Sequence, residues 1–207
     1  MKQMLALALT IVLCFTVLAS VETTVGTHSA PEHHLGSLLA DCAVYLKNID
    51  ALSKDGFEGY ASTLGFDITL HPDFQLLTDE GFCPVCLKDD RFVQNDGGEP
   101  LFLTGFECYP CGWLNNSYDV TKPNEEEASF VLLIRCYSGI NYLGSFITYL
   151  LGAYCVKYCG GVFEDFEAGM CFDDLAEIER AIAVFADDLT SWAEQGQLYT
   201  IPFEGWF

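Results

Sequence analysis

The sequence predicts an α+β protein, with a small antiparallel β-rich centre stapled by cysteines, an N-terminal helix before it and a helical C-terminal half after it. Three observations support this class. Apolar residues recur at helical spacing near the amino terminus and again in the second half of the chain, whereas apolar and polar residues alternate in between. The 207 residues include 10 cysteines, a number that suits cross-linking. A hydrophobic fraction of 51% is enough for a folded core.

The amino terminus carries the three-part pattern of a secretory signal peptide, which we place at residues 1–19. Lys2 supplies the basic start, an uncharged apolar run follows, and Val17 and Ala19 put small residues just before Ser20. We therefore expect a secreted, extracellular protein. A single-pass membrane protein is the alternative.

Beyond the signal, the chain divides into a leader and two regions. Residues 20–34 are polar and weakly patterned. We expect residues 35–122 to form a helix and a small β domain that contains two CxxC pairs. Residues 123–207 are expected to be a helical region that ends in an aromatic tail.

The first region is predicted to begin with a helix over 37–54. Its apolar residues recur at three- and four-residue steps, Ser37 can cap its start and Gly56 can end it. Alternating patterns and turn residues then predict short strands. These strands are expected at 66–70, 74–77, 91–94 and 101–106.

The second region is predicted to hold three helices. The first begins near Asn124 and breaks at Gly139, and the second runs from Ile140 to Gly160 with small residues at every fourth position. The last helix, over 173–195, has the clearest amphipathic pattern, with Asp173 or Asp174 as its cap and Gly196 as its stop.

Residues 136–156 contain no charge, which raises the question of a membrane span. The stretch also contains polar residues and glycines, and its flanks carry no excess of positive charge on one side. We therefore expect a buried helix. A membrane-anchored or membrane-inserting segment is the alternative.

Removal of the signal peptide would leave nine cysteines, and this odd number means that at least one is unpaired, bound to a metal or bridged to another chain. In a secreted chain we expect most of them to form disulfides. An intermolecular disulfide is one way to use the odd thiol. The sequon at Asn115 offers a glycosylation site. The expected disulfide cysteines outside the CxxC pairs are Cys42, Cys136, Cys155, Cys159 and Cys171.

Two CxxC pairs are the most specific motif: Cys83 with Cys86, and Cys108 with Cys111. The stretch 82–113 resembles a zinc ribbon, with a CPxC first knuckle, a CxxCG second knuckle and a turn between them. The resemblance implies four thiolates around one structural zinc ion. Secretion favours disulfides at the same positions, and a thiol–disulfide exchange site is a third alternative.

Composition and missing motifs limit the function. With 9 basic and 30 acidic residues the net charge is −21, which excludes a phosphate-reading nucleic-acid binder and indicates solubility for an apolar chain more than a binding code. No serine-nucleophile elbow, phosphate-binding loop or HExxH motif occurs. The sequence therefore predicts a secreted cysteine-rich interaction protein with a protein partner, no evident catalytic site and no cofactor. The alternatives are a zinc-ribbon interaction module, a CxxC oxidoreductase and a membrane-inserting protein.

Overall fold

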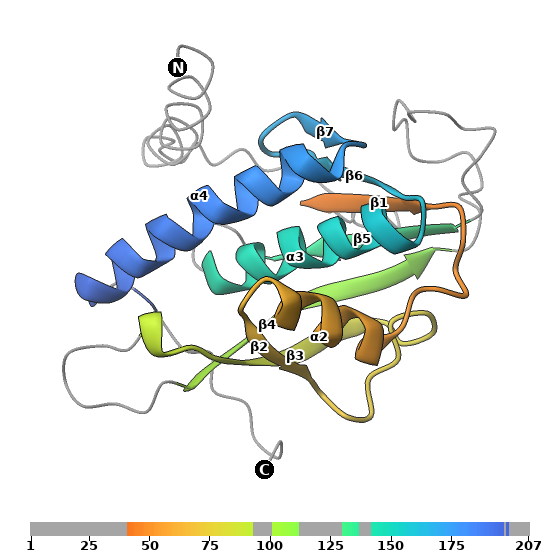
Figure 1. Ribbon diagram of the computed structural model, residues 1–207. Coiled ribbons are helices and arrows are strands. Elements are labelled where there is room, and N and C mark those ends of the chain that lie inside the picture. Colours follow the sequence, from red (N-terminus) through yellow and green to blue (C-terminus); the bar gives the residue numbers. More distant parts are fainter. Residues whose placement is uncertain (1–40, 93–100, 112–129, 137–141, 197, 199–207) are drawn as a thin grey trace, which may run out of the picture.

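The computed structural model describes residues 41–92, 101–111, 130–136, 142–196 and 198. They form a seven-stranded antiparallel sheet with three α-helices, α2, α3 and α4, on one face (Figure 1). The predicted α+β class, with an antiparallel sheet and a helical C-terminal half, is confirmed.

The strands come from both predicted regions and share one sheet in the order β2-β3-β4-β5-β1-β6-β7. Neighbouring strands are antiparallel throughout. Strands β1 to β4 precede residue 122 in the sequence, and strands β5 to β7 follow it. The two predicted regions therefore build a single unit. Their bounds are β1 Cys42–Leu46, β2 Asp67–Leu70, β3 Gly81–Lys88, β4 Leu101–Cys111, β5 Phe130–Arg135, β6 Val162–Asp165 and β7 Met170–Phe172.

The helices α2 (Lys54–Thr63), α3 (Tyr142–Tyr158) and α4 (Leu175–Glu194) pack side by side on the sheet, with α3 between the other two. A short 3-10 helix, η2 (Asp90–Phe92), contacts α4. Because α3 is enclosed by the sheet and by both neighbouring helices, its side chains are buried on nearly every side. The main core lies between the helices and the sheet.

The predicted helix over 37–54 is wrong, because Cys42–Leu46 is strand β1. All five residues of β1 are buried, since it lies between β5 and β6 near the middle of the sheet. A short apolar run buried on both faces does not alternate, and its pattern matches a helix equally well. Gly56 does not end a helix; it lies in the first turn of α2.

A second predicted helix, from Asn124 to Gly139, also fails where the structure describes it, because Phe130–Arg135 is strand β5. The predicted strands at 66–70 and 101–106 are confirmed as β2 and β4. Residues 74–77 form no strand, and β2 pairs with β3 instead. Within 91–94, the described residues belong to η2.

The last two predicted helices are confirmed as α3 and α4. Asp174 caps α4 by accepting a hydrogen bond of 2.9 Å from the Ala176 amide, and Gly196 follows the helix with a φ of +67°. The small residues of α3 serve close packing: a Cβ at Gly152 would lie 2.6 Å from Cγ of Phe163 in β6. Among the described helices, none is long and apolar enough to cross a membrane.

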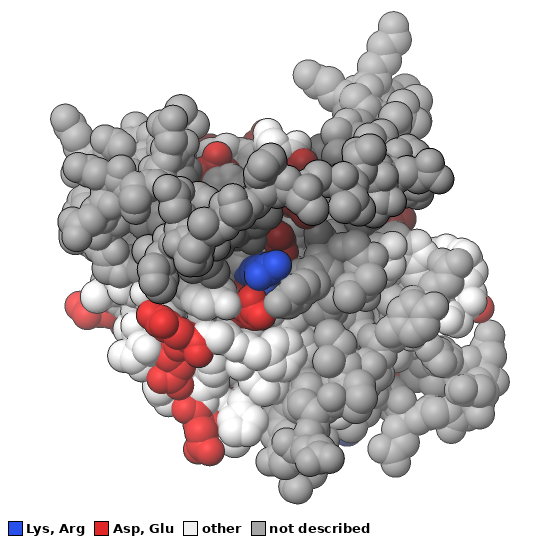
Figure 2. All heavy atoms as spheres, turned by 180° about the vertical axis from the view of Figure 1, so that it is seen from behind, with Lys and Arg blue, Asp and Glu red and all other residues white. Residues whose placement is uncertain are grey.

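The opposite face of the sheet carries a smaller buried apolar cluster. Figure 2 shows this side, where the coloured charges are mainly acidic and lie in separate groups. On this face of the sheet, the Tyr45 hydroxyl donates a hydrogen bond to the Glu164 carboxylate, and the Tyr109 hydroxyl donates one to the Glu107 carboxylate. The cluster consists of Ala43, Tyr45, Val131, Leu133 and Val162.

Candidate functional site: a tyrosine pocket between two helices

The first CxxC pair lies within an extended strand. Cys83 is fully buried on the helix-facing side of β3, whereas Cys86 is partly exposed on the opposite side, because side chains alternate along a strand. A zinc knuckle needs both thiolates on the same side. Among the described residues, no group of three or more His, Cys, Asp or Glu side chains could hold a metal ion.

The second CxxC pair lies in β4. Cys108 is buried and faces the core, and the side chain of Cys111 falls outside the described residues. Cys83 pairs with Phe106 and Cys108 with Gly81, so the two cysteines are diagonal neighbours on one face of the β3–β4 ladder. Burial raises the pKa of Cys83 above its ordinary value, which opposes formation of a reactive thiolate.

Eight cysteines have side chains in the described part of the chain, and no disulfide joins any two of them. The hydroxyl of Thr148 lies 2.8 Å from the thiol of Cys136. The thiols of Cys155 and Cys159 are hydrogen-bonded to each other, which lowers the pKa of Cys159, while burial raises that of Cys155. Most of these thiols act as small apolar core groups. The eight are Cys42, Cys83, Cys86, Cys108, Cys136, Cys155, Cys159 and Cys171.

Several predicted features lie outside the described residues: the signal peptide, the polar leader, the Asn115 sequon and most of the aromatic tail. The structure therefore leaves secretion and glycosylation as predictions.

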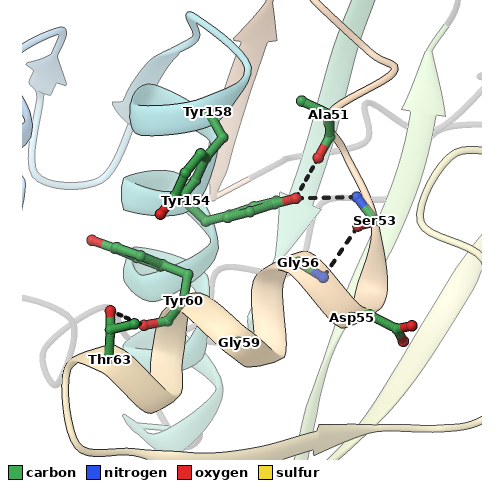
Figure 3. Close-up of a pocket in the computed structure, with 9 residues that line it drawn as sticks. All are labelled: Ala51, Ser53, Asp55, Gly56, Gly59, Tyr60, Thr63, Tyr154 and Tyr158. Atoms are coloured by element: carbon green, nitrogen blue, oxygen red, sulfur yellow. Dashed lines mark hydrogen bonds between the residues drawn. The ribbon is translucent and has the colours of Figure 1, made fainter.

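The described surface contains a pocket of about 420 Å³ at the junction of α2 and α3. We call it the tyrosine pocket, because the rings of Tyr60, Tyr154 and Tyr158 gather on one side of it (Figure 3). It is lined by Ala51, Ser53, Asp55, Gly56, Gly59, Tyr60, Thr63, Tyr154 and Tyr158.

The cap of α2 builds one wall of the pocket. Ser53 caps the helix, and its hydroxyl accepts a hydrogen bond of 3.1 Å from the Gly56 amide. The hydroxyl of Tyr154 reaches this cap from α3, donates to the Ala51 carbonyl and accepts from the Ser53 amide at 3.3 Å (Figure 3). Glycine is needed at position 56, because a Cβ there would overlap the Tyr154 hydroxyl and lie 2.7 Å from Ser53 Oγ.

The three tyrosine rings contact one another. The centroid of Tyr60 lies 6.1 Å from that of Tyr154 and 6.0 Å from that of Tyr158, and the last two are 5.3 Å apart. Tyr60 and Tyr154 are only 2% and 3% exposed, whereas Tyr158 is 47% exposed. Tyr158 is therefore the ring of the cluster that is open to solvent, and the face of a tyrosine ring attracts cations.

One cation already lies on this cluster. The ammonium nitrogen of Lys157 is 5.0 Å from the centroid of Tyr60 and 5.2 Å from that of Tyr158. Both distances are within the range of a cation–π contact. Lys157 itself is exposed, so this contact forms at the solvent boundary of the cluster.

A carboxylate supports the Tyr60 ring from α4. The Tyr60 hydroxyl donates to Glu179 Oε1 at 3.1 Å, and burial together with this carboxylate raises the tyrosine pKa above its ordinary value. The ring therefore remains neutral and electron-rich at physiological pH. The pocket is held by three helices: α2 and α3 form its walls, and α4 fixes one ring.

The lining residues suit binding better than catalysis. No histidine or cysteine is among them, the Ser53 hydroxyl is engaged in the helix cap, and Asp55 points away from the rings (Figure 3). Sequence reasoning missed this site completely. The only available signal was the Tyr154, Lys157, Tyr158 spacing, which places all three side chains near one side of a helix end.

Comparisons with protein-family models, with curated proteins and with solved structures found no match for this chain. The geometry of the pocket is therefore the basis for assigning a function.

Proposed function

We propose that this protein is a secreted binding protein that holds a side chain of a protein partner in the tyrosine pocket. The observation that carries the proposal is the convergence of three tyrosine rings from two helices on one opening of about 420 Å³. This volume lies within the usual range of ligand sites. The signal-peptide pattern of residues 1–19 supports secretion.

The way the pocket is built also supports a binding role. The Tyr154 hydroxyl is fixed by the helix cap and the Tyr60 hydroxyl by Glu179, so two of the three rings are held in place before a ligand arrives. Pre-organised aromatic groups bind with a low entropic cost, and tyrosine is enriched at the energetic centres of protein interfaces. The exposed ring of Tyr158 is the part of the pocket that a partner meets first.

The experiment uses blocked amino acids as partner fragments. N-acetyl methylamides of lysine, arginine, glutamate, leucine and alanine are titrated into the full chain, and tyrosine ring signals are followed by NMR. At least one fragment is expected to shift the signals of Tyr60, Tyr154 and Tyr158 in a saturable manner. Failure of all five fragments to do so would overturn the proposal.

A matched pair of variants tests the location. A Cβ at Gly59 meets nothing within 4 Å, so Gly59→Leu is expected to fold normally and to fill the pocket. Ser62→Leu adds the same side chain to an exposed position of α2 outside the pocket. Fragment binding should be lost in Gly59→Leu and kept in Ser62→Leu. Equal binding by both variants would place the site elsewhere and contradict the proposal.

A further inference from the structure

We propose that the group the tyrosine pocket accepts is an alkylammonium, supplied by a lysine side chain of the partner, and that Lys157 is its built-in competitor. This inference rests on the proposed function and names the ligand class of the same site.

The position of Lys157 shows which chemistry the rings accept. Its ammonium lies 5.0 Å from the Tyr60 centroid and 5.2 Å from the Tyr158 centroid, so one cation contacts two rings of the cluster. Ring faces carry the negative part of the aromatic quadrupole, and a cation on them is attracted electrostatically. A lysine from outside presents the same group to the same rings.

Neighbouring groups favour a cation over an anion. The Tyr60 hydroxyl donates to Glu179, which places a negative charge behind the ring, and the Tyr154 hydroxyl donates to the Ala51 carbonyl. The Tyr60 proton is engaged with this carboxylate, so it is not offered to an anion in the pocket. The net charge of −21 adds a long-range attraction for a basic partner, which raises its rate of association.

Lys157 is suited to leave when a partner arrives. It lies in the last turn of α3, its side chain is exposed, and no salt bridge of Lys157 occurs among the described residues. Tyr60 is 2% exposed when the Lys157 ammonium lies over its ring. If the ammonium of a partner lysine replaces that of Lys157, the ring stays covered. The incoming lysine therefore has to replace an existing contact, and the affinity is lowered by that competition.

The test compares N-acetyl-lysine methylamide with its uncharged analogue, N-acetyl-norleucine methylamide, by the same NMR titration. The lysine derivative is expected to bind more tightly than norleucine and more tightly than the arginine and glutamate derivatives. Tighter binding of norleucine, arginine or glutamate would overturn the alkylammonium assignment. The proposed function would survive that result, since the pocket would still bind a side chain.

Two charge-matched variants test the competition. Lys157→Gln removes the resident ammonium, and Lys88→Gln removes one positive charge from an exposed position at the end of β3. Loss of the competing cation–π contact should tighten lysine binding by about two- to fivefold in Lys157→Gln. Lys88→Gln should change it by a smaller factor, through net charge alone. Unchanged or weaker binding in Lys157→Gln would overturn the competitor role.

Discussion

Gly56 and Gly59 of α2 offer a sharp test of how the tyrosine pocket is built. Both are helical glycines three residues apart, and alanine is favoured over glycine in a helix by about 1 kcal/mol. Helix propensity alone predicts that Gly56→Ala and Gly59→Ala both stabilise the protein. The structure predicts opposite signs.

The difference comes from the Tyr154 hydroxyl. A Cβ at Gly56 would overlap that hydroxyl and lie 2.7 Å from Ser53 Oγ, whereas a Cβ at Gly59 meets nothing within 4 Å. Gly56→Ala therefore disturbs two hydrogen bonds of Tyr154 and the Ser53 cap bond. At about 1 kcal/mol for each, less the propensity gain, the expected destabilisation is about 1–2.5 kcal/mol. Gly59→Ala should stabilise by about 0.5–1 kcal/mol.

Urea unfolding followed by circular dichroism measures both changes, with equal m-values as the check that only stability has changed. A double-mutant cycle with Tyr154→Phe identifies the cause, because removal of the hydroxyl should recover a large part of the Gly56→Ala penalty. A Gly56→Ala variant as stable as the wild type, or a Gly56→Ala penalty that Tyr154→Phe leaves unchanged, would show that the Tyr154 hydroxyl does not set the requirement for glycine at position 56.

Three further predictions concern the core, the surface charge and the thiols. Gly152→Val should destabilise by more than about 2 kcal/mol in urea unfolding, because its Cβ would lie 2.6 Å from Cγ of Phe163; a loss below that value would contradict the packing of α3 on β6. Partial burial and an acidic neighbour raise the pKa of Asp188, so its charged form destabilises the fold above that pKa. Asp188→Asn should therefore raise Tm slightly at pH 7 and leave it unchanged at pH 2, where both states are protonated; a gain of equal size at pH 2 would contradict this. Under native conditions, thiol alkylation followed by peptide mass spectrometry should label Cys171, which is exposed, and then Cys86 before the fully buried cysteines; faster labelling of a buried thiol would contradict the structure.

The sequence predicted elements well where the pattern of apolar residues has one solution. In α4, apolar residues recur along one side and Asp174 and Gly196 mark the ends, so both type and bounds could be predicted. In β1 and β5 every residue or nearly every residue is buried, and a short run without alternation does not distinguish a strand from a helix. These segments become strands because β1 pairs with β5 and β6, which lie far from it in the sequence.

The candidate site could not be predicted for the same reason. Its central hydrogen bond joins Ser53 and Tyr154, which are 101 positions apart in the chain. The cysteine motifs drew attention to β3 and β4, where alternation along the strand puts Cys83 and Cys86 on opposite faces. Tyrosines in a helix carry no comparable motif, and they become a site only when α2, α3 and α4 pack together.

The most direct test of the central claim is a titration of N-acetyl-lysine methylamide into the full chain and into its Gly59→Leu variant, followed at the ring signals of Tyr60, Tyr154 and Tyr158. We expect saturable shifts of these rings in the wild type and none in the variant. Shifts of equal size in both proteins, or no shifts in the wild type, would contradict the central claim.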